Sequence, residues 1–437
     1  YKTRQNTSLT GEITLTPVKW LEIKSQNTYR PYYVQGFKYS PSTLPGRYEG
    51  QGGQAWRQEY RSMQLLTENT VTAKKKFGSH YVDGMVGFSA SRMTTDDMQV
   101  TADGIIDDNF LWYNMNAVSS KEGYNVTSSS YDIIRESVFA RANYNFKDRY
   151  YLTATVRGDA CSAFSENNKW GFFPSAAFKW NISKEPFLQG VRWISTLALR
   201  ASAGRTGNDA ISAYRSRNVF TSTTSGAPIF NGSQGTTLYP SRVANPDLTW
   251  EKTTQYNIGV DFSIFKDRLT ITADAYYSRT TDLLLSVKTI QSTGFDNRFT
   301  NLGLTSNKGV ELTIVSHNFD RRKFGWITEF TISHNSQRVE DIGHEDYVSL
   351  VDSSGYMMYG YKAGYPLNAL WGFQYEGVFH NEEEVRRNRV LHTYASQTGF
   401  SDNDDLKHVG RAKYADVDGD GSRFSLSKSS DRKNYSI

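Results

Sequence analysis

The sequence has 437 residues with a mean hydropathy of -0.59, and aromatic side chains make up 14% of it. No apolar run approaches the ~18 residues that a membrane-spanning helix requires, which excludes a helical membrane protein but allows strands that place every second residue in lipid. The 50 basic and 45 acidic residues give a net charge of +5 without a Lys/Arg stripe, so no nucleic-acid partner is expected.

Six hairpins with short turns are predicted along the chain. They pair 9–15 with 21–23, 63–73 with 82–90, 138–146 with 150–159, 172–180 with 193–201, 256–264 with 269–277, and 310–314 with 324–332. Each strand is about ten residues long, the length that a tilted strand needs to cross a bilayer.

The third hairpin shows the pattern most clearly. Val138, Ala140 and Ala142 are apolar, while Arg141 and Asn143 between them are polar, and the returning strand alternates in the same way. Such alternation gives a strand one apolar and one polar face. A hairpin of a soluble sandwich alternates equally well, so one hairpin alone does not decide between the two fold classes.

The connections between hairpins favour a barrel in the membrane. Segments near 30–59, 92–135, 205–250 and 281–306 are long, polar and rich in Gly, Ser and Asn, and they largely alternate with the short turns. In an up-and-down barrel, alternate connections emerge at opposite ends, and outer-membrane barrels have short periplasmic turns and long extracellular loops. The sequence therefore predicts an all-β, transmembrane, antiparallel up-and-down β-barrel of about 12 to 13 strands.

Two regions of this single barrel domain are expected. Residues 1–336 form the transmembrane hairpins with their extracellular loops, and residues 337–437 form a long extracellular loop region with one strand at 371–379, a charged helix at 382–387 and an Asp-rich turn. An open sheet edge in lipid leaves backbone groups without partners. We therefore expect further closing strands outside these residues.

One candidate metal site is present. Asp416, Asp418 and Asp420 precede Gly421, which matches the first half of a Ca²⁺ loop in which alternate carboxylates face one cation. The twelfth position of such a loop is a bidentate Glu, and here it is Ser427. A plain Asp/Gly turn explains the same residues.

Candidate contact residues for a substrate or a lid are aromatic and lie in the predicted loops: Trp56, Trp112, Tyr113, Tyr239 and Trp371. Aromatic rings stack on sugar faces and hold peptide side chains, although packing within the loops accounts for them equally well. We expect no enzyme, because the seven histidines lack metalloprotease spacing and no glycine-rich phosphate loop opens a helix. The single cysteine, Cys161, excludes an internal disulfide framework.

Several phrases resemble those of one family. They are residues 139–155 (FARANYNFKDRYYLTAT), 170–175 (WGFFPS), 245–253 (NPDLTWEKT), 307–311 (NKGVE) and 416–421 (DVDGDG). In this order they are similar to the SusC/RagA-type TonB-dependent transporters of Bacteroidota outer membranes.

The resemblance implies a barrel of about 22 strands closed by an N-terminal plug. The plug, the TonB-contacting segment and the closing strands would lie outside this sequence. The implied function is import of a bulky nutrient, an oligosaccharide or an oligopeptide, across the outer membrane. The implied partners are a SusD-like lipoprotein lid, TonB and outer-membrane lipid, with a dimer of transporter–lid pairs as the assembly. A passive porin, or a structural or adhesive barrel, is the alternative.

Overall fold

The computed structural model describes most of the chain. The described residues are 1–45, 51–120, 123–223, 229–230, 233–234, 237–288, 295, 297–321, 323–343, 348–353, 357–367, 369–372, 374–387, 409–414 and 433–434. The chain divides into two compact units: unit 1 comprises residues 1–274, 284–301 and 312–331, and unit 2 comprises residues 275–283, 302–311 and 332–437.

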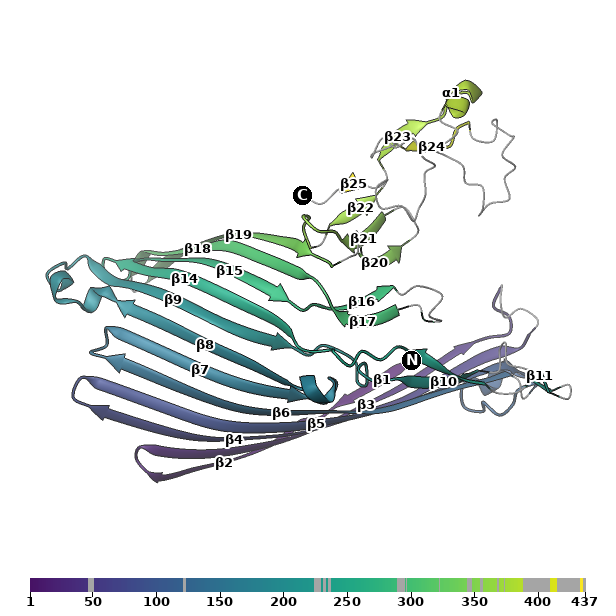
Figure 1. Ribbon diagram of the computed structural model, residues 1–437, viewed down its shortest axis with the longest axis horizontal. Helices are drawn as coiled ribbons and strands as arrows, with labels where there is room; N and C mark the ends of the chain where they lie inside the picture. Colours follow the sequence, from purple (N-terminus) through teal and green to yellow (C-terminus); the bar gives the residue numbers. More distant parts are fainter. Residues whose placement is uncertain are drawn as a thin grey trace. The chain divides into compact units, whose positions relative to one another are not determined.

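A 13-stranded sheet dominates the fold, in the order β1-β3-β4-β5-β6-β7-β8-β9-β14-β15-β18-β19, with β2 also paired to β3 (Figure 1). Its strands are β1 Lys2–Asn6, β2 Leu9–Val18, β3 Leu21–Ser40, β4 Gly53–Phe77, β5 His80–Ile105, β6 Tyr124–Phe146, β7 Tyr150–Cys161, β8 Trp170–Asn181, β9 Ile194–Asn208, β14 Glu251–Ile264, β15 Leu269–Thr281, β18 Leu304–Arg321 and β19 Phe324–Asp341. All six predicted hairpins and the predicted strand number are confirmed. In the described part of the chain the sheet ends at β1 and β19 and is not closed.

The remaining elements are short. They are β10 Val219–Thr223, β11 Ile229–Phe230, β12 Ser233–Gln234, β13 Thr237–Arg242, β16 Leu284–Lys288, β17 Asn297–Asn301, β20 Val348–Ser353, β21 Met357–Tyr361, β22 Leu370–Gly372, β23 Tyr375–Val378, β24 Ala412–Tyr414, β25 Lys433–Asn434, the helix α1 Glu382–Arg387, and the 3₁₀ turns η1 Asp108–Phe110, η3 Glu166–Asn168, η4 Ile182–Lys184 and η5 Pro186–Leu188. No helix among the described residues is long and apolar enough to cross a membrane.

Alternation along the strands separates two faces in unit 1. In the middle of β7, Leu152 (49%), Ala154 and Val156 are exposed, while Thr153 and Thr155 between them are half-buried. The pairing aligns these apolar positions across strands, with Val86 opposite Ala140 and Ala140 opposite Val156. We call the side that carries these residues the outer face and the opposite side the inner face. The outer face is therefore a continuous apolar band of the kind that contacts lipid.

The strands are longer than predicted. β4, β5 and β6 contain 25, 26 and 23 residues, whereas about ten suffice to cross a bilayer. Much of 30–59 and 92–135, predicted as loop, is therefore strand. We call this extension the arm: residues 30–40, 53–62, 94–105 and 124–132. Polar side chains occur on both of its faces, because a strand that leaves the lipid no longer needs an unbroken apolar side.

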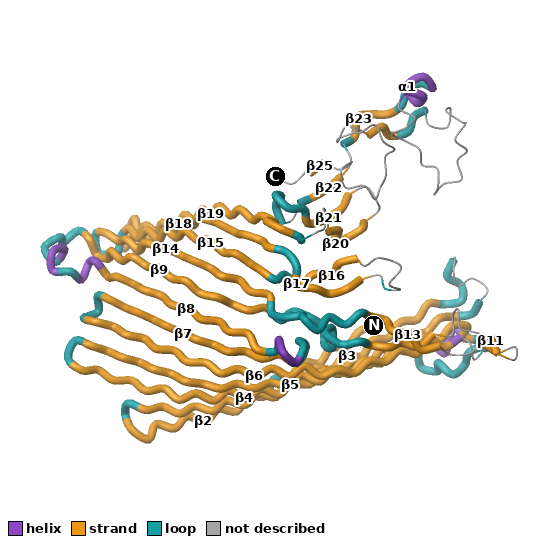
Figure 2. The backbone as a smooth tube through the Cα atoms, in the orientation of Figure 1, coloured by secondary structure: helices purple, strands orange, loops and turns teal. Residues whose placement is uncertain are grey.

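The turn between β6 and β7 uses left-handed backbone. Lys147 and Asp148 have φ of 55° and 54°, and the Asn145 side chain bonds to both the side chain and the backbone N–H of Asp148 at 2.6 and 3.0 Å. Positive φ matches the twist of paired strands. In unit 1 the short turns lie together at one end of the sheet, as Figure 2 shows.

Unit 2 has a small core of its own. Val339 and Ile342 are almost completely buried, and Tyr361 and Leu367 pack against them. The predicted helix at 382–387 is present as α1. The strand predicted at 371–379 is instead two short strands, because β22 pairs with β21 while β23 pairs with β24. β19 also continues beyond residue 336, the predicted end of the hairpin region.

Candidate functional site: the inner wall and the loops above it

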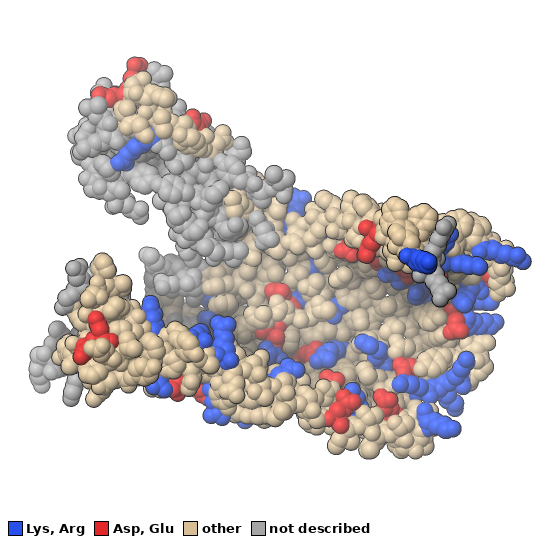
Figure 3. All heavy atoms as spheres, turned by 180° about the vertical axis from the view of Figure 1, so that it is seen from behind, with Lys and Arg blue, Asp and Glu red and all other residues tan. Residues whose placement is uncertain are grey.

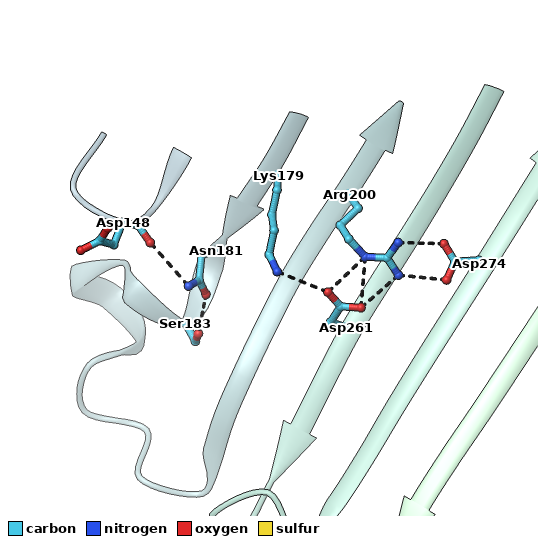
Figure 4. Close-up of polar contacts among 7 residues, drawn as sticks. All are labelled: Asp148, Lys179, Asn181, Ser183, Arg200, Asp261 and Asp274. Atoms are coloured by element: carbon cyan, nitrogen blue, oxygen red, sulfur yellow. Dashed lines mark hydrogen bonds and ion pairs between the residues drawn. The ribbon is translucent and has the colours of Figure 1, made fainter. Parts of the chain in front are cut away.

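A cluster of charges on the inner face joins four neighbouring strands (Figure 4). Arg200 of β9 donates from Nε to both carboxylate oxygens of Asp261 of β14 at 3.1 Å, and from its two Nη atoms to Asp274 of β15 at 3.0 and 2.9 Å. Lys179 of β8 lies 3.6 Å from the Asp261 carboxylate. The guanidinium is thus held by two carboxylates, one of which it bonds in the bidentate fork that suits it best.

Gly259 of β14 leaves space for this cluster because it has no side chain. A Cβ atom there would lie 2.4 Å from Asp274 Oδ1 and 2.8 Å from Arg200 Cζ. Any side chain at this position would therefore push the two partners apart. On the other side of β14, Val260 and Phe262 occupy outward positions, so the cluster lies behind the apolar band.

The inner face stays polar along β5, β6 and β7. Asn143 donates to Asp83 at 2.7 Å and accepts from the Thr153 hydroxyl at 2.8 Å. Arg157 donates to its neighbour Asp159 at 2.7 Å on the same face. Polar side chains that bond to one another across strands make a hydrophilic wall, which is the opposite of a packed apolar core.

At the loop end, an apolar cluster covers part of the inner face. Its buried members are Ile133, Cys161, Ala163, Phe164, Phe173, Ile211, Leu248 and Trp250. Trp250, 5% exposed, donates from its indole to the Lys169 carbonyl at 2.8 Å, and its ring lies 5.2 Å from Phe164 and 5.4 Å from Phe173. Burial raises the pKa of the Cys161 thiol to about 11, so this cysteine is a packing residue.

The phrase at 245–253 fastens this cluster to a second loop. The Asn245 side chain donates to the Phe299 carbonyl at 2.9 Å, and the Asn301 amide bonds both the N–H and the carbonyl of Thr249 at 2.8 Å. This motif is one of those that resemble the family in the sequence. Its role in holding the two loops together could not be predicted, because its partners lie more than 50 residues away.

A carboxylate anchors the loop that follows β5. Asp108 accepts from the Tyr39 hydroxyl at 2.7 Å, from the Ser42 N–H at 2.9 Å and from the Ser42 hydroxyl at 2.8 Å. The Ser42 N–H, followed by the Tyr39 hydroxyl, holds the pKa of Asp108 below its usual value. Sequence analysis did not single out this residue, because both partners lie in the 30–59 segment.

The predicted contact aromatics are placed in different surroundings. Trp112 stacks on Phe37 with ring centroids 6.0 Å apart, and Tyr113 beside it is 79% exposed. Trp56 instead lies over Gly36, where a Cβ would meet its ring at 2.7 Å. Because Phe37 and Gly36 point to opposite sides of β3, Trp112 and Trp56 lie on opposite faces of the arm.

The remaining predicted site residues do not lie at the arm with Trp56, Trp112 and Tyr113. Tyr239 lies in β13 opposite Thr221, and Trp371 lies in β22 opposite Met358. Asp416, Asp418 and Asp420 fall outside the described residues. Within the residues that the structure does describe, no three His, Cys, Asp or Glu side chains are grouped so that they could hold a metal ion.

A groove of about 830 Å³ lies on the outer face of the arm. Its lining includes Tyr33, Glu59, Arg61, Met98 and Ser128, and the Arg61 guanidinium lies 6.0 Å from the Tyr33 ring. The mixture of charge, hydroxyl and ring suits a polar protein surface better than a lipid chain.

The fold and the polar inner wall define an outer-membrane β-barrel, and comparison with known proteins gives its family. Residues 1–431 match the family described as TonB dependent receptor-like, beta-barrel, and the chain belongs to it. TonB-dependent receptor P26 of Formosa agariphila is 32% identical over 386 residues, which cover 87% of this chain and 37% of that relative. TonB-dependent receptor SusC of Bacteroides thetaiotaomicron is 34% identical over 250 residues, 54% of this chain and 25% of that protein.

Solved structures agree on the fold. The RagAB peptide transporter superposes with a TM-score of 0.75 at 23% identity, over 87% of this chain and 41% of that one. The chain thus spans about two fifths of the length of the first of these relatives. Family membership confirms the predicted resemblance to SusC/RagA-type transporters, the outer-membrane location and the prediction that the chain is not an enzyme.

Proposed function

We propose that this chain forms the wall of an importer that takes up an oligosaccharide or an oligopeptide through the outer membrane with energy delivered by TonB. The observation that carries the proposal is the contrast between the two faces of one sheet: an apolar band outside, and a hydrogen-bonded, charged wall around Arg200 inside. A hydrophilic lumen admits polar solutes, which a packed interior would exclude.

A plug is part of the proposal. A barrel of more than about 16 strands encloses an aqueous channel, and 13 strands are already present in this sheet. An ungated pore of that width would leak small solutes. A plug that moves only when TonB pulls on it reconciles a wide lumen with a sealed membrane.

A SusD-like surface lipoprotein is the proposed partner, and pairs of importer and lipoprotein are proposed to associate as dimers. The exposed Tyr113, the Trp112 stack and the outer groove of the arm offer aromatic and polar contacts for such a lid. Trp56, Tyr239 and Trp371 remain proposed contacts with substrate or lid.

Ca²⁺ bound by Asp416, Asp418 and Asp420 also remains a proposal. It is supported by the spacing of these carboxylates alone. Calorimetric titration of the whole protein with Ca²⁺, compared with a variant in which all three are replaced by Asn, tests it: equal heats from both proteins would leave only a plain turn.

The transport proposal is tested in cells. We expect deletion of the TonB-contacting segment to abolish uptake of the growth substrate while surface binding of that substrate persists. A strain that carries the intact gene is the control. Uptake at an unchanged rate without that segment would favour a passive porin, and loss of both binding and uptake with a folded barrel would show that capture does not depend on a separate lid.

A further inference from the structure

Every short turn of the sheet carries a basic residue next to an aromatic one. The six pairs are Lys19–Trp20, Lys76–Phe77, Phe146–Lys147, Arg192–Trp193, Phe265–Lys266 and Lys323–Phe324. All six turns belong to unit 1. The turns differ in length and backbone geometry, so a shared turn conformation does not explain the repeated pair.

The aromatic partners face outward. Trp20, Phe77, Trp193, Phe265 and Phe324 are between 49% and 60% exposed. A large ring left exposed at the end of an apolar band matches the aromatic girdle with which barrels meet the membrane interface. The rings therefore place their turns at the depth of the lipid headgroups.

The basic partners are mostly free of acidic neighbours. Among the described residues, no ion pair or hydrogen bond is formed by the side chains of Lys19, Lys75, Lys76, Lys184, Arg192, Lys266 and Lys323, and all seven are exposed. Figure 3 shows Lys and Arg side chains gathered at this end. Five of the six turns thus carry a cation without such a partner, and these cations create a positive rim beside the apolar band.

The acidic residues of the turns, Asp148, Glu185 and Asp267, are fewer than the basic ones, and each bonds within the protein. Glu185, 6% exposed, accepts hydrogen bonds from Tyr150 at 2.5 Å, Trp180 at 3.1 Å and Arg149 at 3.2 Å. The Tyr150 hydroxyl, then the Trp180 indole, hold the pKa of this carboxyl below its usual value. Asp267 accepts from the Ser263 hydroxyl at 2.5 Å.

We propose that the six turns form a rim that binds the phosphate groups of anionic phospholipids in the adjacent leaflet. Lys and Arg reach the phosphates while their stems lie along apolar surface. Lys147 shows this arrangement, with Nζ 5.2 Å from the Phe146 ring. A soluble anion would require cations converging on one pocket, whereas these cations are spread over six turns and each is paired with a lipid-facing ring. The predicted extracellular position of the long loops places the rim in the periplasmic leaflet.

The test uses the whole protein in detergent, titrated with phosphatidylglycerol and with phosphatidylcholine and observed by native mass spectrometry. The variant Lys19→Gln/Lys75→Gln/Lys266→Gln removes three unpaired cations from the rim. The matched control, Lys2→Gln/Lys38→Gln/Arg217→Gln, removes the same charge from exposed positions at the loop end. Heat-modifiable migration on gels establishes that both variants are folded.

We expect the wild-type protein to bind phosphatidylglycerol more tightly than phosphatidylcholine. Because each cation near an anionic membrane surface contributes roughly fivefold in affinity, the rim variant should bind phosphatidylglycerol at least tenfold more weakly. The control should not change, and Lys→Arg replacements at the three rim positions should restore binding. Equal binding of the two lipids, equal loss in both variants, or preference for lipid A over phosphatidylglycerol would overturn the proposal.

Discussion

An arginine on the outer face should destabilise the barrel far more than an arginine one residue away on the inner face. Ile258 is 61% exposed within the apolar band, and Leu152 is 49% exposed in a different hairpin. A guanidinium at such a position costs about 2 to 4 kcal/mol near the bilayer midplane. Since β7 and β14 are separated by two strands, the two costs should add in Ile258→Arg/Leu152→Arg, to about 4 to 8 kcal/mol.

The inner-face control introduces the same two arginines into the same two strands, β7 and β14. Thr153 donates to Asn143 at 2.8 Å, and Asn257 lies on the same side of β14 as Asp261. Replacement of Thr153 by Arg loses one hydrogen bond, about 1 kcal/mol, and both replacements leave the new cation in a hydrated lumen. Asn257→Arg/Thr153→Arg should therefore lose no more than about 2 kcal/mol. Urea unfolding of the whole protein in lipid vesicles, followed by tryptophan fluorescence and by heat-modifiable migration, measures both; equal losses for the two double variants would refute the assignment of faces.

Three further predictions concern the inner wall and the loops, and a fourth concerns topology. Arg200→Ala leaves two carboxylates facing each other and should lower the free energy of unfolding by about 2 kcal/mol. Arg200→Lys keeps a positive charge between them and should lose less than Arg200→Ala. Urea unfolding of both variants measures the two losses. Trp250→Ala empties a buried site, which typically costs about 3 to 5 kcal/mol, and should expose the surrounding loops to limited proteolysis while Trp250→Phe leaves them largely protected. The pKa of Asp108 is lowered in the folded protein, so its stabilisation is complete above its unfolded pKa and is lost as pH falls through the lowered value; amide exchange of its loop should quicken over that range, and Asp108→Asn should exchange quickly at every pH. An epitope at Tyr113 should be labelled on intact cells and one at Asp148 should not, whereas labelling of both would reverse or break the proposed topology.

The hairpins could be predicted because lipid imposes a strict rule. An outward residue in the membrane must be apolar, and a period of two then fixes every face from Val138 to Val156. Once the chain leaves the lipid, that rule no longer applies. The arm illustrates the consequence: Gln58 donates to Asp97 at 2.9 Å across two regular strands, yet both side chains are polar, and the sequence there looks like loop.

The charged cluster marks a second limit. Asp261 and Asp274 could be assigned to the polar face of the fifth hairpin from alternation alone, because a tight turn sets the register within a hairpin. Arg200 belongs to the fourth hairpin, and a loop of more than 40 residues separates it from β14. The register between the two hairpins, with Arg200 opposite Gly259, follows only from the folded sheet.

That register has a mechanical consequence. Arg200, Asp261, Asp274 and Lys179 join the fourth and fifth hairpins through side chains as well as through backbone bonds, and Gly259 keeps the backbone close enough for the bidentate pair. A cross-linked wall resists sliding of one hairpin past the next, since any slip by two residues would separate the guanidinium from both carboxylates. At the loop end, the Trp250 cluster restrains a further set of loops. In the proposed importer, the wall around Arg200 would be a fixed surface, and the plug would move against it.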